Sequence, residues 1–440
     1  MKKYSLVFLF LIGMIALFSA CNDDETPTPP IVSIESLSGV FSMPQGDTII
    51  LKANVESTLE TTLRWTVNGN EVSTDSIYTF TMNDLGNYEV KLTAINTDGE
   101  TSATEPVEVY GKYKYGTFIL HEGATLRGDV SSKLTFISPK GAFIDSVYQK
   151  ENNGEALKIV CQDLFIFNGK MYIMSQRKAL TVANAETLKK EIIYEDEIST
   201  LMAPTHLVVL DEDHIYIRDN KGVYLFKPSD KTLTFIEGTN GARKNTMALV
   251  DGKIFVTVGS NVVVIEKGNT EISQTLNFEG GVSGIIKSAD KNLWVSDASG
   301  KISKVNVKDY TIQANELPED VAKLLTVSYA AAPSISAKGD TLYISGLQSK
   351  IYRHIFSSKQ TELMVDVKDM VENVGIVYNT VAVNPVTGDV MLNSIKGYGE
   401  NIAISNTSIF DFTGTTPVLK ANYQNYLRYP AGTFFTYNFE

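Results

Sequence analysis

The chain has 440 residues, 43% of them hydrophobic, and it carries 51 acidic against 39 basic residues for a formal net charge of −12. This composition can supply the hydrophobic cores of two or three domains and excludes a disordered chain. An acidic protein repels a phosphate backbone on average, which argues against nucleic acid as a partner.

The N-terminus has the pattern of a secretory signal. Residues 1–3 are Met-Lys-Lys, and an apolar run follows from Ser5 to Phe18 that is too short for a typical membrane span. The run ends in Phe18-Ser19-Ala20-Cys21, which resembles the bacterial lipobox, where the signal is removed and the cysteine becomes a lipidated N-terminus. We predict a signal peptide over residues 1–20 and lipidation at Cys21. The alternative is an ordinary signal peptide with an incidental cysteine.

Residues 21–30 are predicted to form a lipidated tether. Asn22-Asp23-Asp24-Glu25 resembles the surface-export signal of Bacteroidetes lipoproteins, and the proline-rich residues 26–30 form a stiff, extended spacer. Together these features predict a protein held in the outer membrane by its lipid and displayed on the cell surface. A plain solvated spacer is the alternative. The only other cysteine, Cys161, is expected to be a small core residue.

Residues 31–110 are predicted to form a small β-sandwich, because short alternating apolar segments recur between turn residues. Trp65 leads into an Asn68-Gly69 hairpin signal. Asp84-Leu85-Gly86-Asn87-Tyr88 matches a tyrosine corner, in which the phenol hydrogen-bonds backbone just upstream. The segment resembles PKD-like and bacterial Ig-like modules. We interpret it as a spacer.

Residues 111–440 repeat one unit, a polar turn followed by an apolar-aromatic-aliphatic strand. Six copies are centred on Tyr172, Tyr216, Phe255, Trp294, Tyr343 and Met391, at intervals of 39 to 49 residues. This is the period of a four-stranded propeller blade. Residues 116–120 are interpreted as a divergent seventh copy, and residues 434–439 as a strand that closes the ring. The predicted fold is therefore all-β: a small Ig/PKD-like sandwich followed by a seven-bladed β-propeller. Residues 317–325 are expected to form a short helix on one face.

The search for catalytic motifs finds no nucleophile elbow, P-loop, dinucleotide fingerprint or zinc-protease motif in the sequence. The four histidines lack the spacing of metal ligands. We therefore predict a binding protein with no catalytic residue, metal or cofactor. A propeller lyase or hydrolase is an alternative.

Ligands of propellers usually sit where the central channel opens, on loops that lead into the innermost strands and loops that join second and third strands. Aromatic faces with fixed donors suit a planar ligand bearing amides or hydroxyls. His206 and Tyr378 could equally be core residues that line the channel. The candidate ligand-binding residues on these loops are Arg127, Arg177, His206, Arg218, Arg243, Lys244, Asn245, Tyr329, Tyr378, Asn379, Tyr398, Arg428 and Tyr429.

Two motifs carry a family resemblance. Tyr115–Gly123 has a glycine-aromatic-aliphatic run into a polar-Glu-Gly turn, and residues 381–390 run from an aliphatic strand into N-P-x-T-G-D. From Tyr115 onward the chain resembles a Bacteroidetes family of surface lipoproteins with seven-bladed surface-layer-type propellers. Some members capture cobalamin and pass it to a TonB-dependent outer-membrane channel. The resemblance implies capture of a small ligand, with a corrinoid as candidate, for such a transporter. The alternative is an adhesin, or a glycan- or protein-binding scaffold without a small-molecule pocket.

Overall fold

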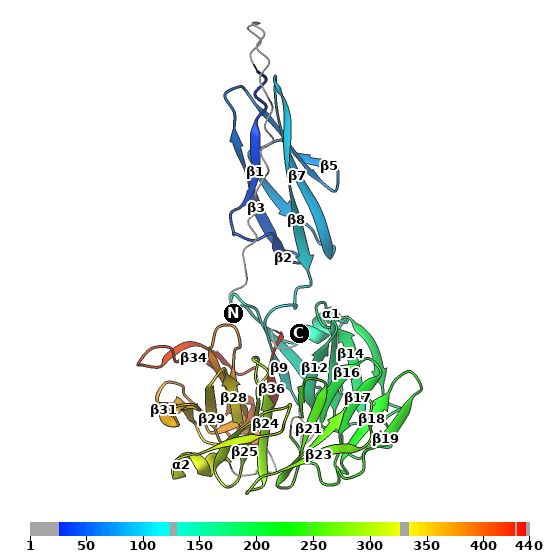
Figure 1. Ribbon diagram of the computed structural model, residues 1–440, viewed down its shortest axis with the longest axis vertical. Coiled ribbons are helices and arrows are strands. Elements are labelled where there is room, and N and C mark those ends of the chain that lie inside the picture. The colour runs from blue at the N-terminus through cyan, green and yellow to red at the C-terminus, as the bar shows by residue number, and fades with distance from the viewer. Residues whose placement is uncertain (1–25, 124–129, 246, 326–333, 427–428, 437–440) are drawn as a thin grey trace. The chain divides into compact units, whose positions relative to one another are not determined.

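The computed structural model describes residues 26–123, 130–245, 247–325, 334–426 and 429–436. Its contacts divide the chain into two compact units, one ending at Val109 and the other beginning at Tyr110 (Figure 1). Cys21 and three of the candidate site residues, Arg127, Tyr329 and Arg428, lie outside the described residues. None of the helices in the described ranges has the length and apolar character needed to cross a membrane.

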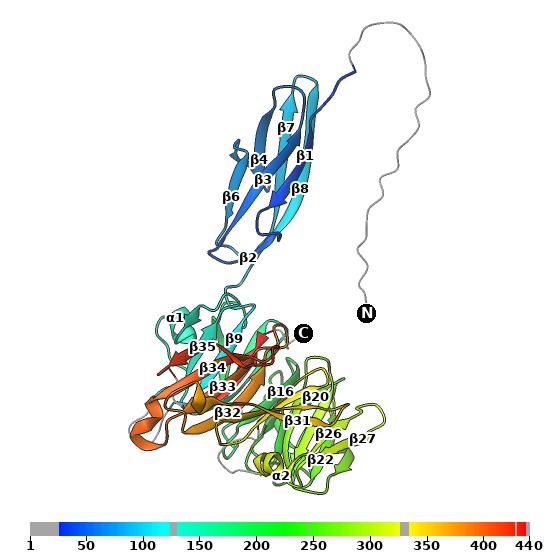
Figure 2. The same ribbon diagram turned by 90° about the vertical axis from the view of Figure 1, so that its left-hand side faces the viewer.

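The first unit is a two-layer β-sandwich, which Figure 2 shows from the side. One sheet has three strands in the order β1-β3-β6, and the other has five in the order β2-β8-β7-β4-β5. The strands are β1 (Ile31–Ser36), β2 (Ser42–Pro44), β3 (Thr48–Glu56), β4 (Thr62–Val67), β5 (Asn70–Ser73), β6 (Ile77–Thr81), β7 (Gly86–Asn96) and β8 (Gly99–Tyr110).

The two sandwich signals in the sequence have the predicted roles. Trp65 is fully buried between the sheets, and its indole N–H donates to the carbonyl of Asp75 at 2.8 Å. The turn that follows β4 has φ of +48° at Asn68 and +80° at Gly69, as a tight hairpin requires. The hydroxyl of Tyr88 donates to the carbonyl of Asp84 at 2.8 Å, so the tyrosine corner is confirmed.

The second unit is a seven-bladed β-propeller, as predicted. Each blade is a four-stranded antiparallel sheet, and the chain runs from the innermost strand outward. The first blade consists of β36 (Pro430–Phe435), β9 (Thr117–His121), β10 (Lys133–Ile137) and β11 (Phe143–Ile144). The second, third and fourth blades are β12 (Cys161–Phe167), β13 (Lys170–Ser175), β14 (Ala179–Asn184) and β15 (Lys190–Tyr194); β16 (His206–Asp211), β17 (His214–Arg218), β18 (Val223–Lys227) and β19 (Thr232–Phe235); and β20 (Ala248–Val250), β21 (Lys253–Val258), β22 (Asn261–Glu266) and β23 (Ile272–Asn277). The fifth, sixth and seventh blades are β24 (Val282–Lys287), β25 (Leu293–Asp297), β26 (Lys301–Val305) and β27 (Ile312–Glu316); β28 (Ser334–Lys338), β29 (Thr341–Ser345), β30 (Lys350–Ile355) and β31 (Gln360–Asp366); and β32 (Ile376–Val383), β33 (Val390–Ile395), β34 (Ser405–Asp411) and β35 (Val418–Gln424).

The first blade closes the ring. The second strand of this blade is β9, which contains the divergent seventh copy of the repeat. Its inner strand is β36, from the far end of the chain. The closing strand starts at Pro430, four residues earlier than predicted, because its register places Pro430 opposite His121. Residues 437–439, the end of the predicted closing strand, lie outside the described residues.

Short helices decorate the ring: α1 (Val147–Glu151), α2 (Glu319–Ala322), and the 3-10 turns η1 (Lys323–Leu325), η2 (Val367–Asp369) and η3 (Gly399–Ala403). Helix α2 with η1 is the helix predicted at residues 317–325.

The repeated apolar strand is the second strand of each blade, covered by neighbouring blades on both faces. In β17, for example, Ile215, Tyr216 and Ile217 are fully buried. The hydroxyl of Tyr216 donates to the carbonyl of Asn269, in the next blade, at 3.1 Å. The repeated aromatic residue therefore joins blades as well as filling the core. Cys161, at the start of β12, is a buried free thiol, as predicted.

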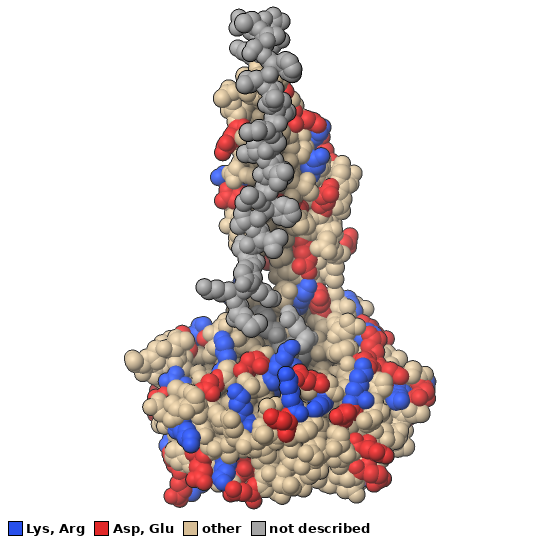
Figure 3. All heavy atoms as spheres, viewed as in Figure 1, with Lys and Arg blue, Asp and Glu red and all other residues tan. Residues whose placement is uncertain are grey.

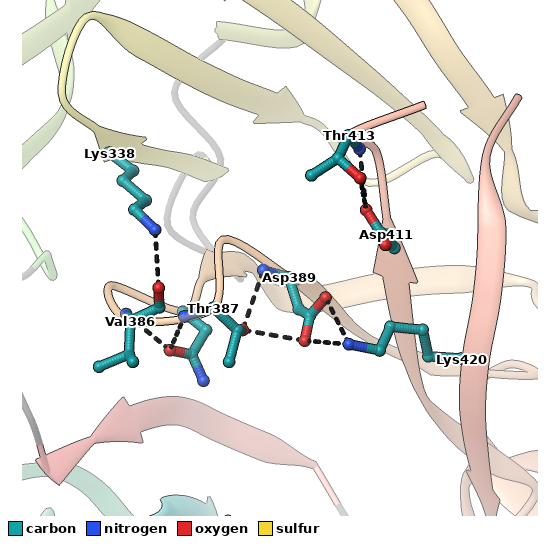
Figure 4. A network of polar contacts seen from close by, with 8 residues as sticks. Lys338, Val386, Thr387, Asp389, Asp411, Thr413 and Lys420 are labelled. Carbon is teal, nitrogen blue, oxygen red and sulfur yellow. Dashed lines mark hydrogen bonds and ion pairs between the residues drawn. The ribbon is translucent and has the colours of Figure 1, made fainter. Parts of the chain in front are cut away.

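The N-P-x-T-G-D motif builds the turn between β32 and β33 (Figure 4). The side-chain oxygen of Asn384 accepts two backbone N–H groups of the turn, at 2.9 and 3.1 Å. Asp389 accepts from the Thr387 hydroxyl at 2.9 Å and from Lys420 of β35 at 2.8 Å. Lys338 of the preceding blade donates to a carbonyl of the turn at 3.0 Å. The N-P-x-T-G-D motif is thus structural: it stabilises the turn between β32 and β33 and connects this blade to the preceding one.

Candidate ligand-binding site

Each inner strand begins at the end of the ring where the second strand of its blade ends. The register pairs Cys161 with Ser175, and His206 with Arg218. We call this end of the propeller face A, and the opposite end, where the inner strands finish, face B. The described candidates on face A are Arg177, His206, Arg218, Arg243, Lys244, Asn245, Tyr398 and Tyr429.

Arg218 anchors the loop in front of β20. Its side chain is buried, and Nη2 and Nε donate to the carbonyl of Ala242 at 2.8 and 3.1 Å. Nη1 donates to the hydroxyl of Thr205 at 3.1 Å and to the Asn220 side-chain oxygen at 3.2 Å. The guanidinium is therefore used within the protein, and it fixes the position of residues 243–245, which follow Ala242.

Lys244 stands on that fixed loop and is half-buried. Burial lowers the pKa of Lys244, the negative charge of Glu122 opposes this shift, and Arg218 adds to it. Glu122 belongs to the first blade, where its backbone N–H donates to the carbonyl of Tyr429 at 2.8 Å. Groups from the first and third blades thus act on one lysine of face A.

His206 is an electrically neutral member of the same group. Burial, and then the positive charges of Arg218 and Lys244, hold the pKa of His206 well below its usual range. Its Nδ1 is 3.0 Å from the hydroxyl of Thr205. At neutral pH, with Nδ1 engaged by Thr205, the ring can offer one further hydrogen-bond donor or acceptor, at Nε2, without adding charge.

The structure adds a residue that the sequence search missed. Asp163 is buried in the inner strand β12 and accepts N–H groups from Leu164 at 2.9 Å and from Leu207, in the next blade, at 3.0 Å. Burial raises the pKa of Asp163 to about 7, against the effect of these two donors. The available signal was the polar pair Gln162-Asp163 inside an otherwise apolar strand.

Face A also holds polar atoms that the protein itself leaves without hydrogen bonds. Five side chains of the described residues contain a buried polar atom with no partner, and four of the five belong to face A: Gln162 Nε2, Arg243 Nε, Ser345 Oγ and Ser394 Oγ. Most buried polar groups in proteins are paired, so such a concentration needs a physical reason. Two of them are fixed N–H donors.

Two tyrosines form one side of the site. Tyr429 is half-buried with φ of +53°, and burial, Tyr398 and Glu122 together raise the pKa of its phenol. Tyr398 is 54% exposed, so its ring is open to solvent. The charge of Glu122 acts on both Lys244 and Tyr429, which connects the tyrosine side of the site to the lysine side.

The remaining candidates have separate positions. Asn245 is buried and donates to the carbonyl of Ser283 at 2.8 Å, so it fastens the loop to the next blade. Arg177 is exposed in the turn between β13 and β14. Tyr378 and Asn379 belong to β32, but their side chains lie outside the described part of the structure. No group of three or more His, Cys, Asp or Glu side chains able to hold a metal ion occurs among the described residues.

Fold and site together define the class of protein: a sandwich followed by a propeller, with buried polar groups gathered on one face of the ring. Residues 29–96 match the PKD-like domain. The chain belongs to the family described as a domain of unknown function, DUF5074, which matches residues 115–436.

One solved structure supports the fold, and two others are less similar. A quinonprotein alcohol dehydrogenase-like protein from Bacteroides thetaiotaomicron is 14% identical, with a TM-score of 0.52, and the match covers 92% of this chain and 99% of that one. A streptogramin B lyase is 13% identical over 60% of this chain and 82% of its own, with a TM-score of 0.41. PorZ from Porphyromonas gingivalis, a surface component of the type-IX secretion system, is 12% identical over 77% of this chain and 44% of its own, with a TM-score of 0.41. No curated protein matches the sequence.

Proposed function

We propose that this protein binds a small polar ligand at the centre of face A. The observation that carries the proposal is the pair of buried donors, Arg243 Nε and Gln162 Nε2, that have no acceptor among the described residues. A buried donor without a partner costs about 1–3 kcal/mol. A ligand oxygen placed against either donor recovers that free energy, and Arg218 already holds the Arg243 loop in place.

The surrounding groups favour a ligand rich in amides or hydroxyls. His206 supplies a neutral donor or acceptor, and Lys244 a cation whose hydration is already reduced by burial. Tyr398 and Tyr429 supply aromatic surface at one side. A corrinoid carries peripheral amides around a planar ring, and the family resemblance from Tyr115 onward makes it the first candidate.

We also propose that lipid on Cys21 anchors the protein at the cell surface, where it passes its ligand to a TonB-dependent transporter. The signal-like start of the sequence and the acidic, proline-rich residues 22–30 support this. Gly111, near the start of the propeller, donates to Glu186 in the turn between β14 and β15, on face B. The chain therefore joins the propeller at the end opposite the proposed ligand. Replacing Cys21 by Ser should abolish metabolic fatty-acid labelling and release the protein from the membrane fraction.

The binding proposal is tested by calorimetric titration of the soluble Cys21→Ser chain with cyanocobalamin, haem, a ferric siderophore and neutral glycans. We expect one of the small ligands to bind at one site per chain. Arg243→Ala and Lys244→Ala should weaken that binding by roughly tenfold to a hundredfold, because each removes one fixed contact of about 1–3 kcal/mol.

Lys359→Gln is the matched control, since Lys359 is an exposed lysine in the turn after β30 on face B. It should bind the ligand like the unmodified chain. A calorimetric signal with a glycan or a partner protein, and with none of the small molecules, would contradict the proposal of small-ligand binding. It would favour the alternative of an adhesin or scaffold. Equal ligand affinity of the Lys244→Ala variant and the unmodified chain would show that the ligand does not bind at Lys244 on face A.

A further inference from the structure

A second polar site lies on face B, away from the proposed ligand. A cavity of about 450 Å³ opens there between three turns of the fourth and fifth blades. Asp251 lines it from the turn between β20 and β21, Lys291 and Asn292 from the turn before β25, and Lys304 and Lys308 from β26 and the turn that follows it.

The cavity is basic, in a protein whose overall charge is negative. Three lysines line it against one carboxylate, that of Asp251. Figure 3 shows acidic and basic side chains interspersed over the visible face of the propeller, without one dominant sign. A local excess of two positive charges is therefore a property of this cavity and cannot be attributed to the general charge of the protein.

The arrangement restrains one of these cations and the backbone of another. Lys304 is half-buried, and its ammonium lies 5.2 Å from the centre of the Trp294 ring, a cation–π contact that limits its freedom. The backbone N–H of Lys308 donates to the side-chain oxygen of Asn306 at 2.9 Å, which fixes the turn. The charge of Lys291 also acts on Lys287, whose pKa is lowered first by burial and second by Lys291, while Asp251 opposes the shift. An anion in the cavity would relieve this repulsion between like charges.

Neutral polar groups complete the lining. Asn292, Asn306, Thr311 and Gln313 lie around the lysines. The Asn292 amide donates to Asp290, the Asn306 oxygen accepts from Lys308 and the Thr311 hydroxyl donates to Asp309, so these three offer a ligand only their remaining N–H groups and lone pairs. Lysine binds an anion as a point charge, whereas amide and hydroxyl groups exchange hydrogen bonds with sugar hydroxyls. The carboxylate of Asp251 can accept from such a hydroxyl, and it is unfavourable for a bare inorganic anion.

We propose that this cavity on face B binds an acidic saccharide, with its anionic group between Lys304 and Lys308 and its hydroxyls on the neighbouring amides. This inference is independent of the ligand on face A, because no residue is shared between the two sites.

The test uses the emission of Trp294, which lies under Lys304; Trp65, in the sandwich, is the only other tryptophan of the chain. The soluble Cys21→Ser chain is titrated with a disaccharide ending in glucuronic acid, with its neutral glucose counterpart, and with inorganic phosphate. We expect saturable binding of the acidic disaccharide alone, weakened about tenfold or more in the double variant Lys304→Gln/Lys308→Gln, which loses two charge-assisted contacts.

Because Lys304→Gln itself alters the surroundings of Trp294, each affinity is also measured by calorimetry. Lys359→Gln, another lysine-to-glutamine change on face B, should bind like the unmodified chain. The inference is overturned if the neutral disaccharide binds as well as the acidic one, if phosphate binds as tightly as the saccharide, or if the double variant keeps full affinity. Loss of cyanocobalamin binding in the Lys244→Ala variant would leave these results unchanged.

Discussion

The two faces of the propeller use the same four-stranded blades in different ways. On face B, short turns satisfy their own polar groups: Asp230, Asp309 and Asp411 each accept both the N–H and the hydroxyl of a threonine two residues later. On face A, strand ends hold a buried guanidinium and a neutral imidazole, and this face also has buried donors without an acceptor among the described residues. Outside the lysine-lined cavity, face B consists mainly of repeated turns, whereas face A collects groups that are not repeated from blade to blade.

The largest expected effect on stability comes from Arg218, whose buried side chain fixes the loop that carries Arg243 and Lys244 on face A. Arg218→Ala removes four hydrogen bonds and leaves the carbonyl of Ala242 and the hydroxyl of Thr205 without their donor. We expect the free energy of unfolding to fall by about 3 kcal/mol, because the change is made in a buried network. Urea denaturation followed by circular dichroism measures it.

Arg353→Ala is the control for that change, since Arg353 makes one ion pair, at 2.6 Å with the 53% exposed Glu362, and one hydrogen bond, to the carbonyl of Phe412 at 3.2 Å, instead of a fully buried network. Such pairs contribute about 1 kcal/mol or less. If both arginine variants lose the same stability, Arg218 is not the anchor of the loop before β20.

The next effect is a dependence of stability on pH that originates on face A. Burial holds the pKa of His206 well below its usual range and that of His121 at about 3, so unfolding takes up protons below pH of about 6.5. Stability should therefore fall as the pH falls from 7 to 5. Asp163, with its pKa raised to about 7, acts in the opposite direction between its ordinary value near 4 and pH 7.

Two variants separate these contributions in urea titrations at pH 7 and pH 5. Asp163→Asn removes the opposing group, so its loss of stability on acidification should be steeper than that of the unmodified chain. His206→Gln should make the loss shallower. A stability that stays constant between pH 7 and pH 5 in all three chains would contradict the burial of these groups.

A smaller effect is expected on face B, from the N-P-x-T-G-D turn. Asn384→Ala removes an oxygen that accepts two backbone N–H groups, as a helix-capping side chain does. We expect a loss of about 1–2 kcal/mol in the free energy of unfolding and no change in ligand binding on face A. Val386→Ala, at a side chain that is 60% exposed in the same turn, should change neither quantity.

The smallest effect is expected from the ion pair of that turn. Lys420 is 2.8 Å from Asp389, and its side chain is 47% exposed. Lys420→Ala should cost about 0.5 kcal/mol, and the difference from the unmodified chain should shrink in 1 M salt because solvent screens exposed charges (about 3 Å Debye length). A loss as large as that of Asn384→Ala would show that charge, rather than turn geometry, holds the blades together here.

The fold could be predicted from the sequence because the patterns that indicate it are local and recur in every blade. The second strand of every blade must be apolar on both faces, so Tyr216 and Trp294 mark the period directly. Trp65 and Tyr88 mark the sandwich in the same way. The start of the closing strand was missed because Pro430 pairs with His121 from the other end of the chain, and no local pattern encodes that register.

The site was only partly predictable, because its loops are not repeats. Basic and aromatic residues near strand starts pointed to face A, but Arg218 and Asn245 could not be recognised from the sequence as groups that fix loops. Asp163 lies within a strand and was overlooked for that reason. Burial and contacts between blades decide these roles, and both depend on closure of the ring.

Amide hydrogen exchange of the soluble chain, with and without saturating cyanocobalamin, tests the ligand site on face A most directly. We expect slower exchange on face A, at residues 118–123, 205–207 and 242–245, with unchanged exchange at residues 304–312 of face B. Protection confined to face B, or no protection at a concentration that saturates the calorimetric signal, would contradict a ligand site on face A.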